Sequence, residues 1–155
     1  DEKLRHNKQI LMIKSHPREK LVIYIPSSCK YIKMLRDEEL EAKNIVLQEV
    51  LADTSALLTD YSGISFEYLL LNRPIEYIVG DMSNYTRGFA FDNPLDYMPG
   101  EKINTLGELL HFLDDIRINR DKFEKVRERL KEKIFKGNEM KNGAEELIKH
   151  LDRFG

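Results

Sequence analysis

The sequence is poor in features that mark several common protein classes. It has one cysteine, Cys29, in 155 residues, so no internal disulfide can form and we expect a reducing compartment. Its apolar runs reach about six residues, far short of the ~20 that cross a bilayer. The charged start is not followed by an apolar segment, so no signal peptide is expected. The chain does not begin with methionine, and we expect it to be a piece of a longer protein.

An excess of charge of one sign is also missing. The chain carries 25 basic and 27 acidic residues, and it has no basic stripe with interleaved aromatics, so nucleic acid is excluded as a partner. No P-loop, dinucleotide glycine fingerprint or nucleophile elbow is present. His6, His111 and His150 lack metal-ligand spacing to other such residues. We therefore expect neither a metal nor a cofactor.

The residues that are present are typical of a soluble globular protein. Hydrophobic residues make up 41% and charged residues 34% of the chain, and the length suits one domain, residues 1–155. The pattern predicts strands at 9–13, 21–25, 55–59 and 75–79, with a brief one at 44–47. It predicts helices at 30–43, 48–53, 64–71, 105–116, 121–135 and 144–154. This alternation indicates an α/β fold with a parallel sheet, closed by helices over about 105–154.

Two of the helices carry specific signals. Thr105 and Glu108 form a capping box at the start of the helix at 105–116. In the helix at 121–135, one apolar stripe is predicted to face the core; it consists of Phe123, Val126, Leu130 and Ile134.

The first candidate site is the turn Thr59-Asp60-Tyr61-Ser62-Gly63, between a predicted strand and a predicted helix. Backbone amides and the Ser62 hydroxyl at a helix N-terminus suit a phosphate group. In the alternative interpretation, Ser62 only caps the helix and no ligand is involved. Asp60 does not suit a bare phosphate site, and it either supports the loop or faces a ribose hydroxyl.

The second and third candidates are His16-Pro17 and Arg87-Gly88. His16 follows a predicted strand, and it could donate hydrogen bonds to a phosphoryl group and steady the charge on a leaving diphosphate. The alternative is a surface histidine before a turn. Arg87, made accessible by Gly88, could bind a phosphate through two hydrogen bonds, or it could pair with Asp81 or Asp92 and only order its loop. We expect His16 and Ser62 to converge at one edge of the sheet.

The ordered set of these elements resembles a known family. It runs from the strand before His16-Pro17 through the segments LLTDYSG (57–63) and FEYLLLNRPI (66–75) to RGF (87–89), FD (91–92) and PG (99–100). The set is similar to the carboxyl-terminal part of the CDP-glycerol glycerophosphotransferases, which include the teichoic acid primases and polymerases. The resemblance covers about residues 10–144.

The resemblance implies a GT-B architecture, in which two Rossmann-like halves enclose a cleft and the carboxyl-terminal half, a three-layer domain, holds the donor nucleotide. It implies transfer of glycerol phosphate from CDP-glycerol to a membrane-linked polymer, with release of CMP, by an enzyme at the cytoplasmic face of the bacterial membrane. His16 would then be catalytic. The substrate-binding residues would be Pro17, Thr59, Asp60, Ser62, Gly63, Arg87 and Gly88.

In this family the general base is expected on the amino-terminal half, which this chain lacks. We therefore expect these residues alone to bind the nucleotide weakly and to turn over no substrate. The sequence also departs from the family at Gly63, where a second serine is usual, and at residues 141–145. Three alternatives stay open: a donor with another polyol such as CDP-ribitol, a CMP-sugar-dependent GT-B enzyme such as a sialyltransferase, and a non-catalytic α/β interaction domain.

Overall fold

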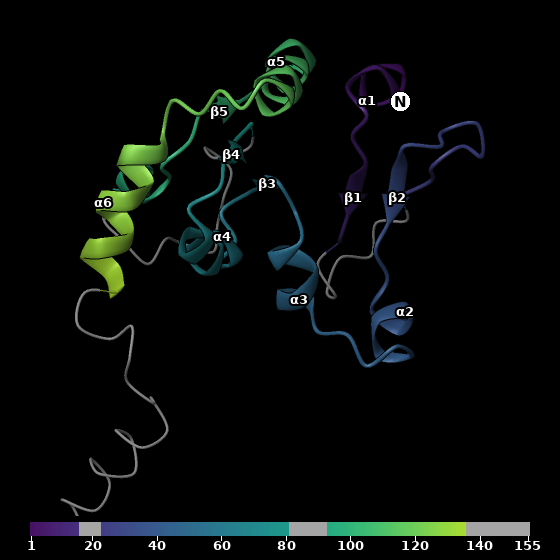
Figure 1. The fold of residues 1–155 in the computed structure, drawn as a ribbon, viewed down its shortest axis with the longest axis horizontal. Helices are drawn as coiled ribbons and strands as arrows, with labels where there is room; N and C mark the ends of the chain where they lie inside the picture. Colours follow the sequence, from purple (N-terminus) through teal and green to yellow (C-terminus); the bar gives the residue numbers. More distant parts are fainter. Residues whose placement is uncertain (16–22, 81–92, 136–155) are drawn as a thin grey trace, which may run out of the picture.

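The computed structural model describes residues 1–15, 23–80 and 93–135. Their strands form two parallel sheets, one with β1 and β2 and one in the order β3-β4-β5 (Figure 1). The strands are β1 (Leu11–Ile13), β2 (Ile32–Met34), β3 (Leu57–Thr59), β4 (Ile75–Ile78) and β5 (Lys102–Ile103). The α/β class with parallel pairing is confirmed. A single sheet was predicted, and the described strands show two.

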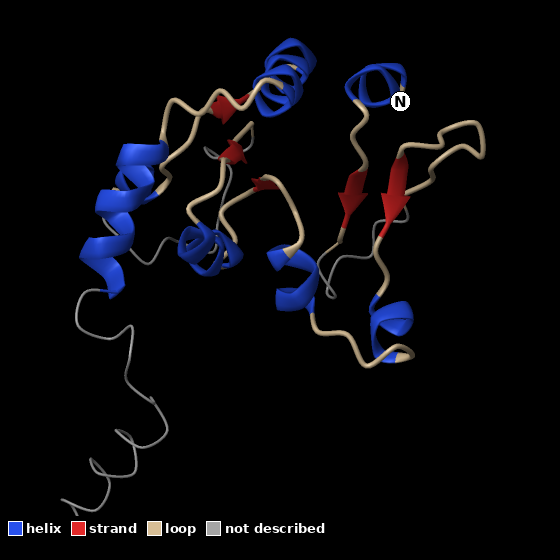
Figure 2. Cartoon of the chain, viewed as in Figure 1, coloured by secondary structure: helices blue, strands red, loops and turns tan. Residues whose placement is uncertain are grey.

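In the described chain, helices precede β1, lie between β2 and β3 and between β3 and β4, and follow β5, as Figure 2 shows. The α-helices are α1 (Glu2–Asn7), α2 (Asp37–Glu41), α3 (Leu47–Ala52), α4 (Ile64–Tyr68), α5 (Leu106–Arg117) and α6 (Glu124–Phe135), and the 3₁₀ turns are η1 (Leu69–Leu71) and η3 (Pro94–Tyr97). The predicted helix at 64–71 is therefore α4 continued by η1. Within the described part of the chain, no helix has the length and apolarity to cross a membrane.

Three predicted elements were wrong in the first half of the chain. Residues 23–25 and 44–46 are not in strands, and residues 21 and 22 lie outside the described part. The predicted helix at 30–43 contains β2 instead, and only α2 remains of it. Charged residues around Ile32 and Met34 favoured a helix locally, but this segment pairs in register with Leu11–Ile13 of β1. Long-range strand pairing overrides local propensity here.

The sequence also missed β5 and wrongly included Val126 in the inward face of α6, whereas Leu130 and Ile134 of the predicted stripe do contact the core. β5 has two residues and is defined by its pairing with β4, so it leaves almost no local pattern. Val126 is 47% exposed, whereas Arg127 is 1% exposed and faces the core. Arg127 is held there by Asp121, through Nη1–Oδ1 at 3.0 Å, and it also donates to the Asn72 carbonyl at 3.3 Å. A buried arginine is stable only with such partners.

The main core lies around the second sheet. Its buried members come from α4, η1, β4, α6 and the chain before β5; they are Tyr68, Leu69, Ile75, Tyr77, Met98 and Leu130. β4 is flanked by β3 and β5, and three of its four residues are buried. The predicted capping box at the start of α5 is confirmed, with the Glu108 amide donating to Thr105 Oγ1 at 3.2 Å and the Thr105 amide donating to Glu108 at 2.9 Å.

Helix α1 connects the amino-terminal part of the chain to α5. Lys3 Nζ lies 2.6 Å from Asp114 Oδ2, and the buried Asn7 amide donates to the Leu113 carbonyl and to Asp114 Oδ1, each at 3.1 Å. Lys3 and Asn7 hold the pKa of Asp114 below its ordinary value. Gln9, just before β1, donates to the same Leu113 carbonyl at 2.8 Å. The start of β1 is thereby fixed to the helix that follows β5.

Candidate functional site

Of the three candidate sites that the sequence predicts, the turn that follows β3 is the one within the described residues. It spans Asp60 to Gly63 and connects the carboxyl end of β3 with α4. The backbone amide of Ser62 donates to Asp60 Oδ1 at 2.8 Å, an Asx-type contact that closes the turn. Asp60, Ser62 and Gly63 are all exposed. The predicted supporting role of Asp60 is therefore present, and the turn is open to a ligand.

Ser65, in the first turn of α4, stabilises the turn through a hydrogen bond. Ser65 is 4% exposed, and its hydroxyl donates to the Ser62 carbonyl at 3.1 Å. Tyr77 of β4 lies behind it, 1% exposed. Burial raises the pKa of Tyr77 to about 12, with the Ser65 hydroxyl acting against the shift. Tyr77 therefore stays neutral at physiological pH and adds no negative charge behind the turn.

The amides at the start of α4 determine what the turn can bind. The Ser65 amide donates to the Ser62 carbonyl at 3.3 Å and the Phe66 amide to the Gly63 carbonyl at 3.0 Å. Within the described structure this leaves the amides of Gly63 and Ile64 without an assigned acceptor. Gly63 is the N-cap, and no side chain caps α4, so Ser62 does not have the capping role that was its alternative. The amides of Gly63 and Ile64 and the exposed Ser62 hydroxyl can together donate hydrogen bonds to the oxygens of one phosphate group.

The remaining predicted residues are placed as follows. Thr59 is 8% exposed and pairs with Tyr77 in the ladder, so its side chain is part of the sheet rather than of the open turn. His16, Pro17, Arg87 and Gly88 lie outside the described residues. The expected convergence of His16 with Ser62 therefore stays a prediction.

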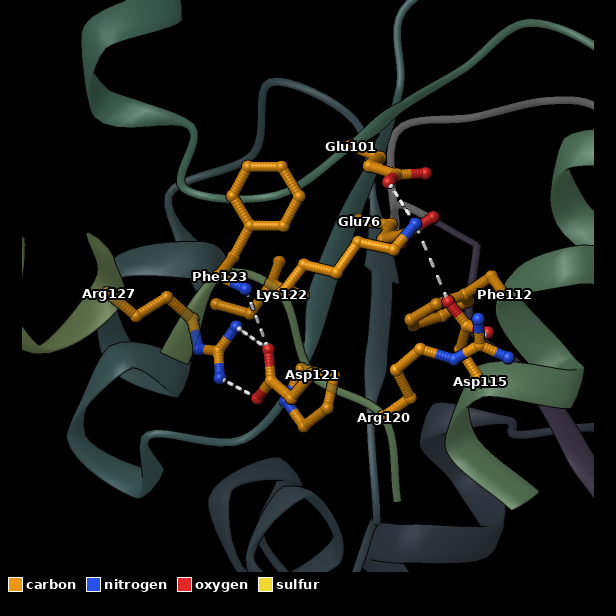
Figure 3. A pocket seen from close by; sticks show the side chains of 11 residues that line it. Glu76, Glu101, Phe112, Asp115, Arg120, Asp121, Lys122, Phe123 and Arg127 are labelled. Carbon is orange, nitrogen blue, oxygen red and sulfur yellow. Dashed lines mark hydrogen bonds and ion pairs between the residues drawn. The ribbon is translucent and has the colours of Figure 1, made fainter. Parts of the chain in front are cut away.

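A second polar group, which the sequence analysis missed, lies around β4 and the start of α6 (Figure 3). Glu76 of β4 is 8% exposed. Burial raises its pKa to about 7, the facing carboxylates of Glu101 and Asp115 add to the shift, and Lys122 acts against it. Lys122 Nζ lies 2.8 Å from Glu101 Oε1 and 3.8 Å from Asp115 Oδ2. A glutamate within the apolar run IEYIV was the signal that could have revealed this group.

Lys102 of β5, a half-buried cation, pairs in the ladder with Tyr77, the residue after Glu76. Its Nζ donates to the carbonyls of Met98 at 2.6 Å and Gly100 at 2.8 Å, and it lies 5.2 Å from the centre of the Tyr77 ring. Desolvation lowers the pKa of Lys102, and Glu76 acts against that shift. These contacts give Lys102 a role in holding the chain before β5.

The size of the cavity in Figure 3 excludes a substrate. Its volume is about 10 Å³, which is room for a single water molecule. The paired side chains of Asp121 and Arg127 form one wall. We therefore assign the Glu76 group to stability.

Comparison with known proteins decides the family. Residues 2–150 match the family described as CDP-Glycerol:Poly(glycerophosphate) glycerophosphotransferase. The chain belongs to this family. Among the alternatives that the sequence left open, the match selects the glycerophosphotransferase family over the sialyltransferases.

Curated relatives of this glycerophosphotransferase-family chain come from Bacillus. A teichoic acid glycerol-phosphate primase of Bacillus subtilis (strain 168) is 36% identical over 93 residues, 59% of this chain and 22% of the relative. A teichoic acid glycerol-phosphate primase of Bacillus spizizenii is 30% identical over 121 residues, 75% of this chain and 30% of the relative. A teichoic acid poly(ribitol-phosphate) polymerase of the same species is 33% identical over 75 residues, 47% of this chain and 12% of the relative.

The chain therefore spans less than a third of the length of each of these relatives. No solved structure matched it.

Proposed function

We propose that this chain is the donor-nucleotide-binding part of a transferase that moves glycerol phosphate from CDP-glycerol to a membrane-linked polymer in teichoic acid or cell-surface polysaccharide synthesis. The observation that carries the proposal is the family match over residues 2–150. The open turn at the carboxyl end of β3 supports it, because parallel sheets bind ligands where the carboxyl ends of their strands lead into loops.

In the proposed reaction, a hydroxyl of the acceptor attacks the phosphorus of the glycerol phosphate, the bond to the bridging oxygen of the diphosphate breaks, and CMP leaves. The Ser62 hydroxyl and the amides of Gly63 and Ile64 would bind diphosphate oxygens, while Asp60 holds the turn closed. His16 would steady the charge on the departing CMP. Pro17, Arg87 and Gly88 would complete the donor site, and the backbone of Thr59 would contribute from the end of β3.

The proposal includes a second, GT-B-type domain that supplies the general base for the acceptor hydroxyl. It also places the complete enzyme at the cytoplasmic face of the membrane, where a lipid-linked polyol-phosphate or glycan acceptor would be elongated. The names of the Bacillus relatives, which are teichoic acid primases and a polymerase, support this setting. We expect the 155 residues alone to bind the donor and to release no CMP from it.

Isothermal titration calorimetry with CDP, CMP and CDP-glycerol tests the donor site. CDP and CDP-glycerol should bind more tightly than CMP, because the turn is proposed to bind a diphosphate. Ser62→Ala should weaken CDP binding roughly tenfold to a hundredfold, the usual cost of losing a hydrogen bond to a charged group. Ser55→Ala is the matched control, because Ser55 is an exposed serine just before the same strand, away from the turn. Equal affinities of the two variants would contradict the proposed site.

A donor carrying ribitol is a second candidate, and the similarity to a poly(ribitol-phosphate) polymerase favours it specifically. The proposed turn would bind the diphosphate common to both donors, so it does not select the polyol. A competition titration of CDP-ribitol against CDP-glycerol on the same chain separates the two. Tighter binding of CDP-ribitol would change the donor and leave the diphosphate site unchanged.

A further inference from the structure

A second pocket, of about 470 Å³, lies at the amino ends of β3 and β4. Three segments form it: residues 52–55 between α3 and β3, Arg73-Pro74 before β4, and Asn119 after α5. Its volume is within the range of about 300–1,000 Å³ that is usual for ligand pockets, unlike that of the cavity in Figure 3. The turn at 60–63 follows β3 at the other end, roughly 16 Å away along the chain. The pocket is therefore separate from the proposed donor site.

Arg73 supplies a positive charge to this pocket, and its guanidinium is held in place by backbone carbonyls. Its Nη1 donates to the Ala52 carbonyl at 2.6 Å and also to the Thr54 carbonyl. Burial raises the pKa of the neighbouring Tyr68, and the Thr54 hydroxyl and Arg73 act against that shift. Among the described residues, no carboxylate forms an ion pair with Arg73. Its charge is therefore oriented but not compensated, which suits binding of a phosphate group.

Three exposed polar residues also line the pocket: Asp53, Ser55 and Asn119. Asn119 has a left-handed backbone, with φ at 52°, and its amide donates to the Ile116 carbonyl at 3.2 Å. A carboxamide and a hydroxyl can each donate and accept hydrogen bonds, whereas a carboxylate only accepts them. A bare phosphate would be repelled by Asp53. A ligand that carries hydroxyl groups beside its phosphate would give the same carboxylate a donor.

We propose that this pocket binds a hydroxylated phosphate ester of the polyol phosphate type, with Arg73 on the phosphate and with Asp53 and Ser55 on the hydroxyl groups. Asn119 donates to a phosphate oxygen or accepts from a hydroxyl. The guanidinium compensates the charge of the phosphate, and the hydroxyl groups satisfy the carboxylate. The inference goes beyond the proposed donor site, because it concerns the opposite ends of the strands and a different set of residues.

An NMR titration of the whole 155-residue chain with glycerol phosphate tests the site. We expect saturable shift changes at the amides of Ser55, Arg73 and Asn119. Glycerol and inorganic phosphate are the matched ligands, because the first lacks the phosphate and the second lacks the hydroxyl groups. Each should bind roughly tenfold more weakly than glycerol phosphate, since each leaves some of the polar side chains of the pocket without a partner.

Two variants test the residues. Arg73→Lys keeps the charge but loses the planar pair of donors, so it should weaken glycerol phosphate binding roughly tenfold. Arg36→Lys, at an exposed arginine outside the pocket, is the matched control. Because Arg73 also holds the chain at the end of α3, its replacement can lower stability. Asn119→Gly is therefore the second variant: glycine adopts the left-handed backbone readily, so the protein should fold and bind about fivefold more weakly.

Shift changes confined to residues 60–63 would place glycerol phosphate in the turn after β3 and would overturn the proposal. Equal affinities for inorganic phosphate and glycerol phosphate would also overturn it, because the hydroxyl groups would then contribute nothing. An unchanged affinity of Asn119→Gly, or of a folded Arg73→Lys, would remove the assigned residues. Failure of CDP to bind the turn would change none of these outcomes, so the two sites are tested separately.

Discussion

Replacing Glu76 with glutamine should stabilise the protein, and by an amount that depends on pH. Glu76 is buried and faces Glu101 and Asp115, which together with burial raise its pKa to about 7 from an ordinary 4.5. Between these values the folded protein keeps a proton that the unfolded chain has lost, so the free energy of unfolding falls as the pH rises. At about 1.4 kcal/mol for each tenfold change in proton affinity, the ionised carboxylate costs up to about 3 kcal/mol at pH 8.

Glu76→Gln removes this titration and keeps the size of the side chain. Urea denaturation at pH 5 and pH 8 should give similar stabilities for the two proteins at the lower pH, and an advantage for Glu76→Gln approaching 3 kcal/mol at the higher pH. Glu41→Gln, at an exposed position of α2, controls for the loss of one negative charge. The pKa of Lys102, the neighbouring cation, is lowered from 10.5. In the unfolded chain this lysine stays charged from about pH 5 to pH 8.

The pKa of Glu76 can also be measured directly by NMR titration. In Glu101→Gln, the carboxylate that faces Glu76 is gone and Lys122 loses its partner at 2.8 Å, so the NMR titration midpoint of Glu76 should move down. If Glu76→Gln is no more stable than the native protein at pH 8, or if its advantage is the same at pH 5, then Glu76 is not a buried carboxylate with a raised pKa.

Three further predictions concern the backbone and the core. Gly100→Ala should prevent stable folding, because the added Cβ would lie 1.9 Å from the Ile75 carbonyl oxygen. Gly63→Ser should fold normally, since nothing lies within 4 Å of a Cβ at that position. Circular dichroism and thermal unfolding of the two variants test this difference. Arg127→Ala should cost about 3 kcal/mol in urea denaturation, because it leaves Asp121 without its partner, and a loss below 1 kcal/mol would contradict that role. Thr105→Ala should cost about 1 kcal/mol by loss of the N-cap.

The candidate site shows how far local sequence reasoning extends. A hydroxyl-and-glycine turn between an apolar strand and a helix was predicted at 59–63, and the structure has that turn between β3 and α4. The contacts that stabilise it span two or three residues, from Asp60 to Ser62 and from Ser65 to Ser62, so the sequence pattern contains them. The pairing of Thr59 with Tyr77 could not be foreseen in the same way, because the two residues are distant in sequence.

The sequence by itself determined the α/β class, the capped start of α5, the turn after β3 and the family. These features depend on short-range hydrogen bonds, on apolar periodicity and on an ordered set of motifs. Tertiary structure alone decided that Ile32–Met34 is a strand, that Arg127 rather than Val126 faces the core, and that Glu76 keeps its proton near neutral pH. Each of these depends on strand pairing, on burial or on charges contributed by segments far apart in the chain, and no local pattern of residues records which segments those are.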